Sequence, residues 1–222
     1  MKARSVRKLD RQAPLGDNAE RIVRVRLDEL YGFIPAALNV KNVVALHDMR
    51  IAAKRLRYLL EVTGFCFGPY ASTATKRAKE LQDLLGEIHD CDVMLPLVDS
   101  HRRGLRSEDV AALLLLAGEA DDLDPQIASQ APNAAAYQGL DVLELYLQTR
   151  RDLLFERFLA LWQSYERQAF RARLEWAVGE RASSQDGDVD LQATSPLMPA
   201  SLSLDPGTTM TVAAFIPTSD PK

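Results

Sequence analysis

The chain has 222 residues, 47% of them hydrophobic, which predicts one globular domain with appendages and a sizeable core. No apolar run approaches the roughly 18 residues that span a bilayer, and residues 1–14 lack the apolar centre of a secretory signal, so we expect a soluble, cytoplasmic protein with no membrane partner. The net charge of −4 hides an asymmetry, because residues 1–79 carry 16 Lys and Arg against 7 Asp and Glu, whereas residues 80–222 carry 11 against 24.

The first predicted elements are an arm and three helices. Residues 1–16 are basic, contain Pro14 and Gly16, and are predicted to form a basic flexible arm. Asp17 followed by Glu20 has the spacing of a capping box and marks the start of the first helix. Apolar residues at spacings of three and four then predict helices over residues 17–34, 43–67 and 71–93.

Proline and polar residues divide the second half of the chain. Pro96 predicts a break or kink, and the polar stretch 101–107 predicts an interruption. The elements expected after it are a short helix over 107–117, an acidic loop over 118–133 and a long helix over 133–178. Residues 181–222 are rich in Ser, Thr, Pro, Gly and Asp, which predicts a disordered or loosely attached tail.

The pattern indicates an all-α fold. The alternation that marks β-strands is missing from the sequence over 17–178. Helices joined by short turns favour an antiparallel four-helix bundle over residues 17–180, with a long C-terminal helix.

The most informative segment is 47–61 (HDMRIAAKRLRYLLE). At 100° per residue, its apolar side chains fall on one face and a row of polar side chains falls on the opposite face. The row consists of His47, Arg50, Lys54, Arg57 and Tyr58, with Arg55 on its flank.

Three cations on one helix face repel one another, at a few tenths of a kcal/mol per pair. A polyanion would relieve this repulsion, because arginine matches phosphate oxygens with two donors and lysine serves as a point charge. Histidine protonation is favoured beside phosphate, so binding should tighten at acidic pH. We expect further basic clusters to converge on this face, namely Lys76, Arg77 and Lys79 on the third helix and Arg21 and Arg24 on the first.

Three segments resemble the CHAD family, the conserved histidine α-helical domain. Residues 46–61 (LHDMRIAAKRLRYLLE) resemble its signature, and residues 79–95 (KELQDLLGEIHDCDVML) resemble its second motif. Residues 146–176 are similar to the closing helix of the family. The resemblance covers about residues 17–178, and only one copy of the histidine motif is found where the family usually has two four-helix bundles.

The resemblance implies a function. CHAD domains bind inorganic polyphosphate through basic residues and the signature histidine, associate with polyphosphate granules in bacteria, and sometimes accompany triphosphate-cleaving CYTH enzymes. Carried over, His47, Arg50, Lys54, Arg57 and Tyr58 match the signature, Arg55 matches a more variable basic position, and Lys79 leads the second motif. The resemblance thus implies a non-enzymatic polyphosphate-binding protein without a cofactor, active as one bundle or as a homodimer, with a CYTH enzyme as a further candidate partner.

Three alternatives stay open. A metal-dependent phosphohydrolase, or an accessory subunit of a triphosphate-cleaving enzyme, would need a metal site, for which His89, Asp90 and Asp92 are the only local candidates. Nucleic-acid binding is disfavoured, because Tyr58 is the only aromatic residue near the basic row and the acidic second half would repel a duplex. The third alternative is a helical bundle that binds no ligand.

Overall fold

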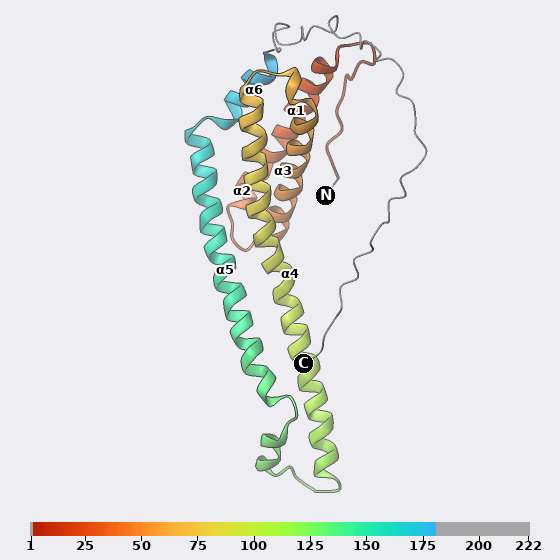
Figure 1. The fold of residues 1–222 in the computed structure, drawn as a ribbon. Coiled ribbons are helices and arrows are strands. Elements are labelled where there is room, and N and C mark those ends of the chain that lie inside the picture. The colour runs from red at the N-terminus through yellow and green to blue at the C-terminus, as the bar shows by residue number, and fades with distance from the viewer. Residues whose placement is uncertain (1, 181–222) are drawn as a thin grey trace, which may run out of the picture. The chain divides into compact units, whose positions relative to one another are not determined.

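Helices account for almost all regular structure in the computed structural model, which describes residues 2–180 (Figure 1). These residues contain two 3₁₀ turns, η1 (Gly64–Cys66) and η2 (Pro125–Gln130), and no strand, so the all-α prediction is confirmed. The predicted tail, 181–222, lies outside the described residues. The six α-helices are α1 (Leu15–Gly32), α2 (Ile34–Ala37), α3 (Val43–Thr63), α4 (Tyr70–Ala117), α5 (Ala134–Arg167) and α6 (Phe170–Gly179).

One hydrophobic core joins all six of these helices. Helix α3 packs against α1 and α4, and α4 in turn packs against α5 and α6. The prediction of four antiparallel helices stays a prediction, since all six helices contribute to the core. Each of them contributes a side chain that is at most 1% exposed, for example Leu27, Leu56, Leu85, Phe158 and Leu174.

The N-terminal segment contacts α1. Its backbone N–H groups at Asp10 and Arg4 donate to the side chains of Asn18 and Glu29. Helix α1 begins at Leu15 with Pro14 at its N-cap, so the prediction of Asp17 as the cap was wrong. Asp17 instead lies in the first turn, where its charge is favourable next to the helix dipole.

Helix α4 runs unbroken through Pro96 for 48 residues, so the predictions of a break at Pro96 and of an interruption over 101–107 were wrong. An internal proline costs about 3 kcal/mol, mainly because one backbone hydrogen bond is lost. Cys91 and Val98, on either side of it, are buried in the core. Tertiary packing therefore outweighs the local preference of this proline.

The predicted long helix over 133–178 is divided in two. Ala169 adopts a left-handed conformation (φ 51°, ψ 44°) and separates α5 from α6. This conformation costs roughly 1–2 kcal/mol for a residue with a Cβ atom. The turn brings Phe170 and Leu174 into the core, where both are at most 1% exposed, and each buried side chain of this size contributes about 1.5–3 kcal/mol.

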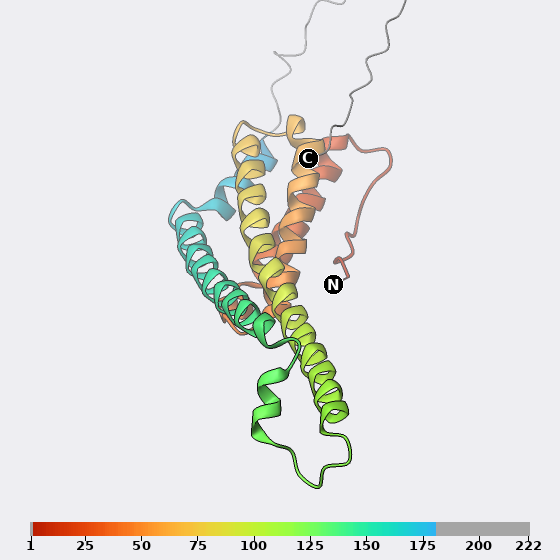
Figure 2. The same cartoon turned by 60° about the horizontal axis from the view of Figure 1, so that its bottom comes forward.

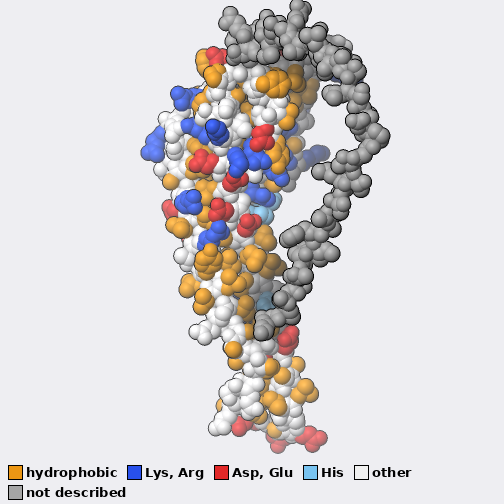
Figure 3. Space-filling view, viewed as in Figure 1, with side chains coloured by type: hydrophobic (Ala, Val, Ile, Leu, Met, Phe, Trp, Pro, Cys, Tyr) orange, Lys and Arg blue, Asp and Glu red, His pale blue; other side chains and the backbone are white. Residues whose placement is uncertain are grey.

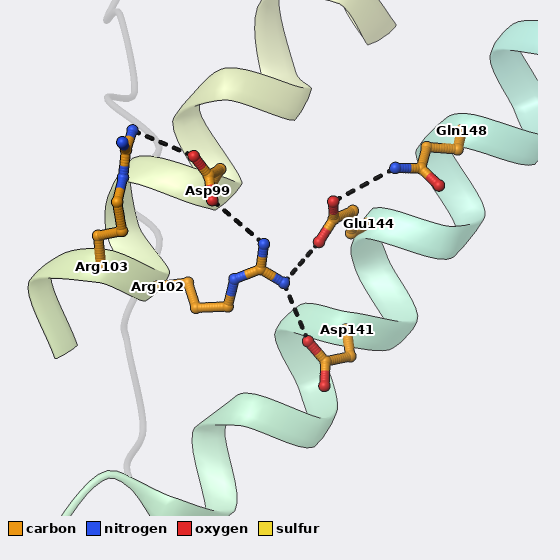
Figure 4. A network of polar contacts seen from close by, with 6 residues as sticks. All are labelled: Asp99, Arg102, Arg103, Asp141, Glu144 and Gln148. Atoms are coloured by element: carbon orange, nitrogen blue, oxygen red, sulfur yellow. Dashed lines mark hydrogen bonds and ion pairs between the residues drawn. The ribbon is translucent and has the colours of Figure 1, made fainter. Parts of the chain in front are cut away.

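Helices α4 and α5 form a hairpin that continues past α1 and α3 (Figures 1 and 2). Much of its seam is polar, because Arg102 binds Asp99, Asp141 and Glu144 (Figure 4). The outside of the hairpin is more apolar, since thirteen of the twenty-two exposed large hydrophobic side chains of residues 2–180 lie between positions 93 and 153. None of the helices in residues 2–180 combines the length and apolarity that a bilayer span requires.

The ion pair of Arg151 with Asp92 fastens α5 to α4. Their side chains are 11% and 7% exposed, and Arg151 also donates to the Val40 carbonyl oxygen at 2.8 Å. We expect Arg151→Ala to lower the free energy of unfolding by about 3–5 kcal/mol, because it leaves a buried carboxylate without its partner. Urea denaturation measures this loss.

The matched control is Asp152→Ala. Asp152 is 75% exposed and contacts the same arginine at 4.0 Å, so its removal should cost less than about 1 kcal/mol. Equal losses in the two variants would contradict the structural role assigned to Arg151.

Candidate anion-binding face

The basic row lies on helix α3, whose opposite face is packed in the hydrophobic core. Asn42 caps the helix by accepting a hydrogen bond from the Ala45 backbone N–H at 3.1 Å. The row of His47, Arg50, Lys54, Arg57 and Tyr58 is called the α3 stripe below; Tyr58 is exposed and the other four residues are partly exposed. The back of the helix is formed by Met49, Ala52, Ala53, Leu56 and Leu60, all at most 1% exposed.

Two cations of the α3 stripe contact the ring of Tyr58. The Arg57 Cζ atom lies 4.5 Å from the centre of the Tyr58 ring, and the Lys54 Nζ atom lies 5.6 Å from it. Tyr58 is itself 46% exposed. Cation–π attraction of about 0.5–1 kcal/mol offsets part of the repulsion between neighbouring cations, so the ring helps to keep both charges at the surface.

The cations of the α3 stripe are largely unpaired. Arg50 and Lys54 form no ion pair with any carboxylate in residues 2–180, and Arg57 contacts only Glu61 of its own helix, at 3.5 Å. The Nε atom of Arg50 is buried without a hydrogen-bond partner within the described chain, and the buried Nε atom of Arg57 makes only the 3.5 Å ion-pair contact with Glu61, which is not a hydrogen bond. A buried donor without an acceptor costs about 1–3 kcal/mol and calls for a specific explanation. An acceptor supplied by a bound anion would remove this cost.

Helix α4 adds groups that sequence analysis did not place at this site. Gln82, Gly86 and His89 are spaced by four and three residues and therefore share one face of α4; they are called the α4 edge below. This face meets α3, because the Nδ1 atoms of His89 and His47 lie 3.4 Å apart and their ring centroids 4.6 Å apart.

The α4 edge is open and incompletely satisfied. The Gln82 Oε1 atom is buried and has no hydrogen-bond partner in the described residues. A Cβ atom on Gly86 would meet no atom within 4 Å, so this position leaves space beside α3. A glycine inside a helix costs about 0.5–1 kcal/mol relative to alanine. Gly86 therefore lowers the free energy of unfolding slightly while it leaves this space open.

His89 does not join Asp90 and Asp92 in a metal site. Its ring faces His47, whereas Asp92 binds Arg151 of α5. Over residues 2–180, no group of three or more His, Cys, Asp or Glu side chains is arranged to hold a metal ion. The pKa of His89 is lowered, first by burial and then by the charges of Arg50 and His47, against the opposing effect of Asp90 and Asp92.

The basic cluster at the start of α4 is spread over several surfaces. Arg77 donates to the Tyr70 hydroxyl at 2.9 Å and also bonds to Gln168, so it faces the junction of α5 and α6. Lys79 forms a 2.6 Å ion pair with Asp83. Lys76 lines a groove of about 620 Å³ between α4 and α5 and a second groove at the C-terminal end of α3, so it is the member of this cluster that reaches α3.

The remaining predicted residues contact other parts of the molecule. Arg21 donates to the Lys8 carbonyl oxygen, and Arg24 pairs with Glu20 and donates to the Glu175 carbonyl oxygen of α6. Arg55 makes contacts of its own. Convergence of all basic clusters on the α3 stripe therefore stays a prediction.

Figure 3 shows how charge is distributed on the face seen in Figure 1. Lys and Arg side chains gather over the upper part of α4 and α5, where Asp and Glu side chains lie among them. Hydrophobic side chains cover the middle of the hairpin below. The mixed charge on this side makes it a weaker candidate for a polyanion than the α3 stripe.

The lowered pKa of His89 predicts how stability depends on pH. The unfolded chain takes up this proton at a higher pH than the folded protein, so the free energy of unfolding decreases as the pH falls below about 6.5. We expect His89→Gln to lose less stability than wild type between about pH 7 and 5.5, measured by urea denaturation. The control is His101→Gln in the exposed part of α4; the same pH profile in wild type and His89→Gln would refute the expectation.

Comparison with known proteins gives one match. Residues 1–99 match the family model for the CHAD domain. Neither the curated proteins nor the solved structures contain a match. The matched residues include α1, α2, α3 and the first half of α4, and thus both the α3 stripe and the α4 edge. Residues 1–99, somewhat less than half of the chain, are therefore similar to the CHAD domain family.

Proposed function

We propose that the protein binds inorganic polyphosphate along the α3 stripe and the α4 edge, without cleaving it. The observation that carries this proposal is that Arg50 and Lys54 have no carboxylate partner within residues 2–180, and that the buried Nε donor of Arg50 lacks an acceptor there. The match of residues 1–99 to the CHAD family model supports the same ligand class.

The shape of the site favours a chain of phosphates over a single anion. His47 and Arg57 are ten residues apart, which corresponds to about 15 Å along a helix. Arg50 and Lys54 lie between them on the same side. Successive phosphates of a flexible chain could thus meet successive cations, with arginine offering paired donors and lysine a point charge.

The acidic half of the molecule does not neutralise the α3 stripe. Its carboxylates bind arginines of their own hairpin or of the neighbouring seam, namely Arg102, Arg150 and Arg151. Within residues 2–180, no ion pair connects the α3 stripe with a residue beyond position 99. The net negative charge of the chain is therefore compatible with a local site for anions.

Location at polyphosphate granules is part of the proposal, and it follows from the CHAD family rather than from the site. A protein that holds polyphosphate without cleaving it would remain bound to a granule surface. Purified protein should accordingly release no orthophosphate from polyphosphate, whereas release that disappears in His47→Ala would replace binding by catalysis.

Binding should depend on the unpaired cations. We expect Arg50→Gln/Lys54→Gln to weaken binding of long-chain polyphosphate at least tenfold at about 100 mM salt. By analogy with single-stranded nucleic acids, the loss of two phosphate contacts should also reduce the slope of log K against log salt by about 1.4. Fluorescence anisotropy over a salt series measures both quantities.

The matched control is Arg103→Gln/Arg106→Gln, which removes the same charge from the exposed hairpin. Arg103 is 70% exposed and pairs only with Asp99. This variant should bind almost as wild type does. Equal weakening in the two double variants would reduce the proposal to a general effect of net charge, and would contradict a site on α3.

A further inference from the structure

The two imidazole rings at the crossing of α3 and α4 face each other through the same type of atom. The Nδ1 atoms of His47 and His89 are 3.4 Å apart. A neutral imidazole has one donor and one acceptor nitrogen, whereas a protonated ring has two donors. If both rings are protonated, two N–H groups face each other without an acceptor, so the empty pair disfavours double protonation.

We infer that His47, His89 and Arg50 form a proton-linked subsite, in which one phosphate of the bound chain docks beside the two facing Nδ1 atoms while the rings take up protons from solvent. This inference rests on the proposed function and adds His89 to the site. A phosphate oxygen would accept from both Nδ1–H groups. The neighbouring Arg50 Nε–H, which lacks an internal acceptor, is available to the same phosphate.

The charges around His47 and His89 disfavour protonation of His89 in the free protein. From α3, Arg50 and His47 face His89, and both oppose its protonation. From α4, Asp90 and Asp92 favour protonation, but Asp92 is bound by Arg151 of α5. The pKa of His89 is therefore lowered overall in the free protein, and a phosphate placed among these groups reverses the balance.

Open space and a side-chain donor support docking at this point. Gly86, one turn before His89 on the α4 edge, leaves open space where another residue would place a side chain. On the same face, the side-chain amide N–H group of Gln82 is a donor that can bind phosphate, whereas its Oε1 atom, an acceptor, cannot.

The number of protons taken up when polyphosphate binds is the quantity that tests this inference. Each neutral ring that becomes protonated takes one proton from solvent, so binding consumes up to two protons per site. By linkage, each proton taken up increases the affinity about tenfold for every unit of decrease in pH. Long-chain polyphosphate is the appropriate probe, because terminal phosphates, which titrate near pH 6, are few.

The experiment is calorimetric titration of the protein with long-chain polyphosphate at pH 7, in buffers of different ionisation enthalpy. Wild type should take up between about 0.5 and 2 protons per site, and His89→Gln should take up at least about 0.5 proton fewer, with a shallower dependence of affinity on pH from 6 to 8. The control His101→Gln, a histidine substitution in the exposed hairpin, should behave as wild type.

A second measurement needs no substitution. The ring C–H resonances of His89, followed by NMR against pH, should show a higher pKa in the presence of polyphosphate than in its absence. Polyphosphate binding with equal proton uptake in wild type and His89→Gln, and with no change in the His89 titration, would overturn the subsite and leave the proposed function standing. Failure of wild type to bind at any pH between 6 and 8 would instead overturn both.

Discussion

The burial of the apolar back of α3 is the interaction on which the candidate site depends. Met49, Leu56 and Leu60 are at most 1% exposed, and full burial of side chains of this size contributes about 1.5–3 kcal/mol each. Repulsion between like charges on the opposite face costs only a few tenths of a kcal/mol per pair. The packing of one face can therefore hold the cations of the other in a row that local electrostatics alone would not favour.

Segregation of charge between two parts of the molecule keeps this row available. In the α4–α5 hairpin, carboxylates from both helices surround Arg102, and the same seam contains the buried pair of Arg151 and Asp92. These contacts occupy the acidic side chains locally. On α3, by contrast, Glu61 is the only carboxylate in the described part of the chain that pairs with a cation of the stripe. A chain of net negative charge thus presents a positive helix face.

Periodicity predicted the features that local sequence determines. The amphipathic pattern of residues 47–61 was sufficient to place the α3 stripe on an outward face, and the all-α class followed from the same signal. Periodicity could not predict that α4 continues through Pro96 or that α5 ends before Ala169, because the burial of side chains distant in sequence decides both. A proline that should end a helix lies inside α4, and an alanine with no local signal ends α5.

The site itself was predicted only in part, for the same physical reason. His47 and His89 are 42 residues apart, and only the antiparallel packing of α3 and α4 brings their rings together. Sequence proximity instead grouped His89 with two aspartates as a candidate metal site. The one available signal was the spacing of Gln82, Gly86 and His89 on a single helix face, which becomes meaningful once the neighbour of that face is known.

The central claim is that the arginine N–H groups of the α3 stripe bind an acceptor supplied by an external anion. NMR of the arginine Nε–H groups during titration with polyphosphate tests it most directly. The account predicts that the signals of Arg50 and Arg57 shift and become protected from exchange with water, while those of Arg102 and Arg151, already bound to carboxylates, stay unchanged. Binding that shifts the hairpin arginines and leaves Arg50 and Arg57 unaffected would contradict it.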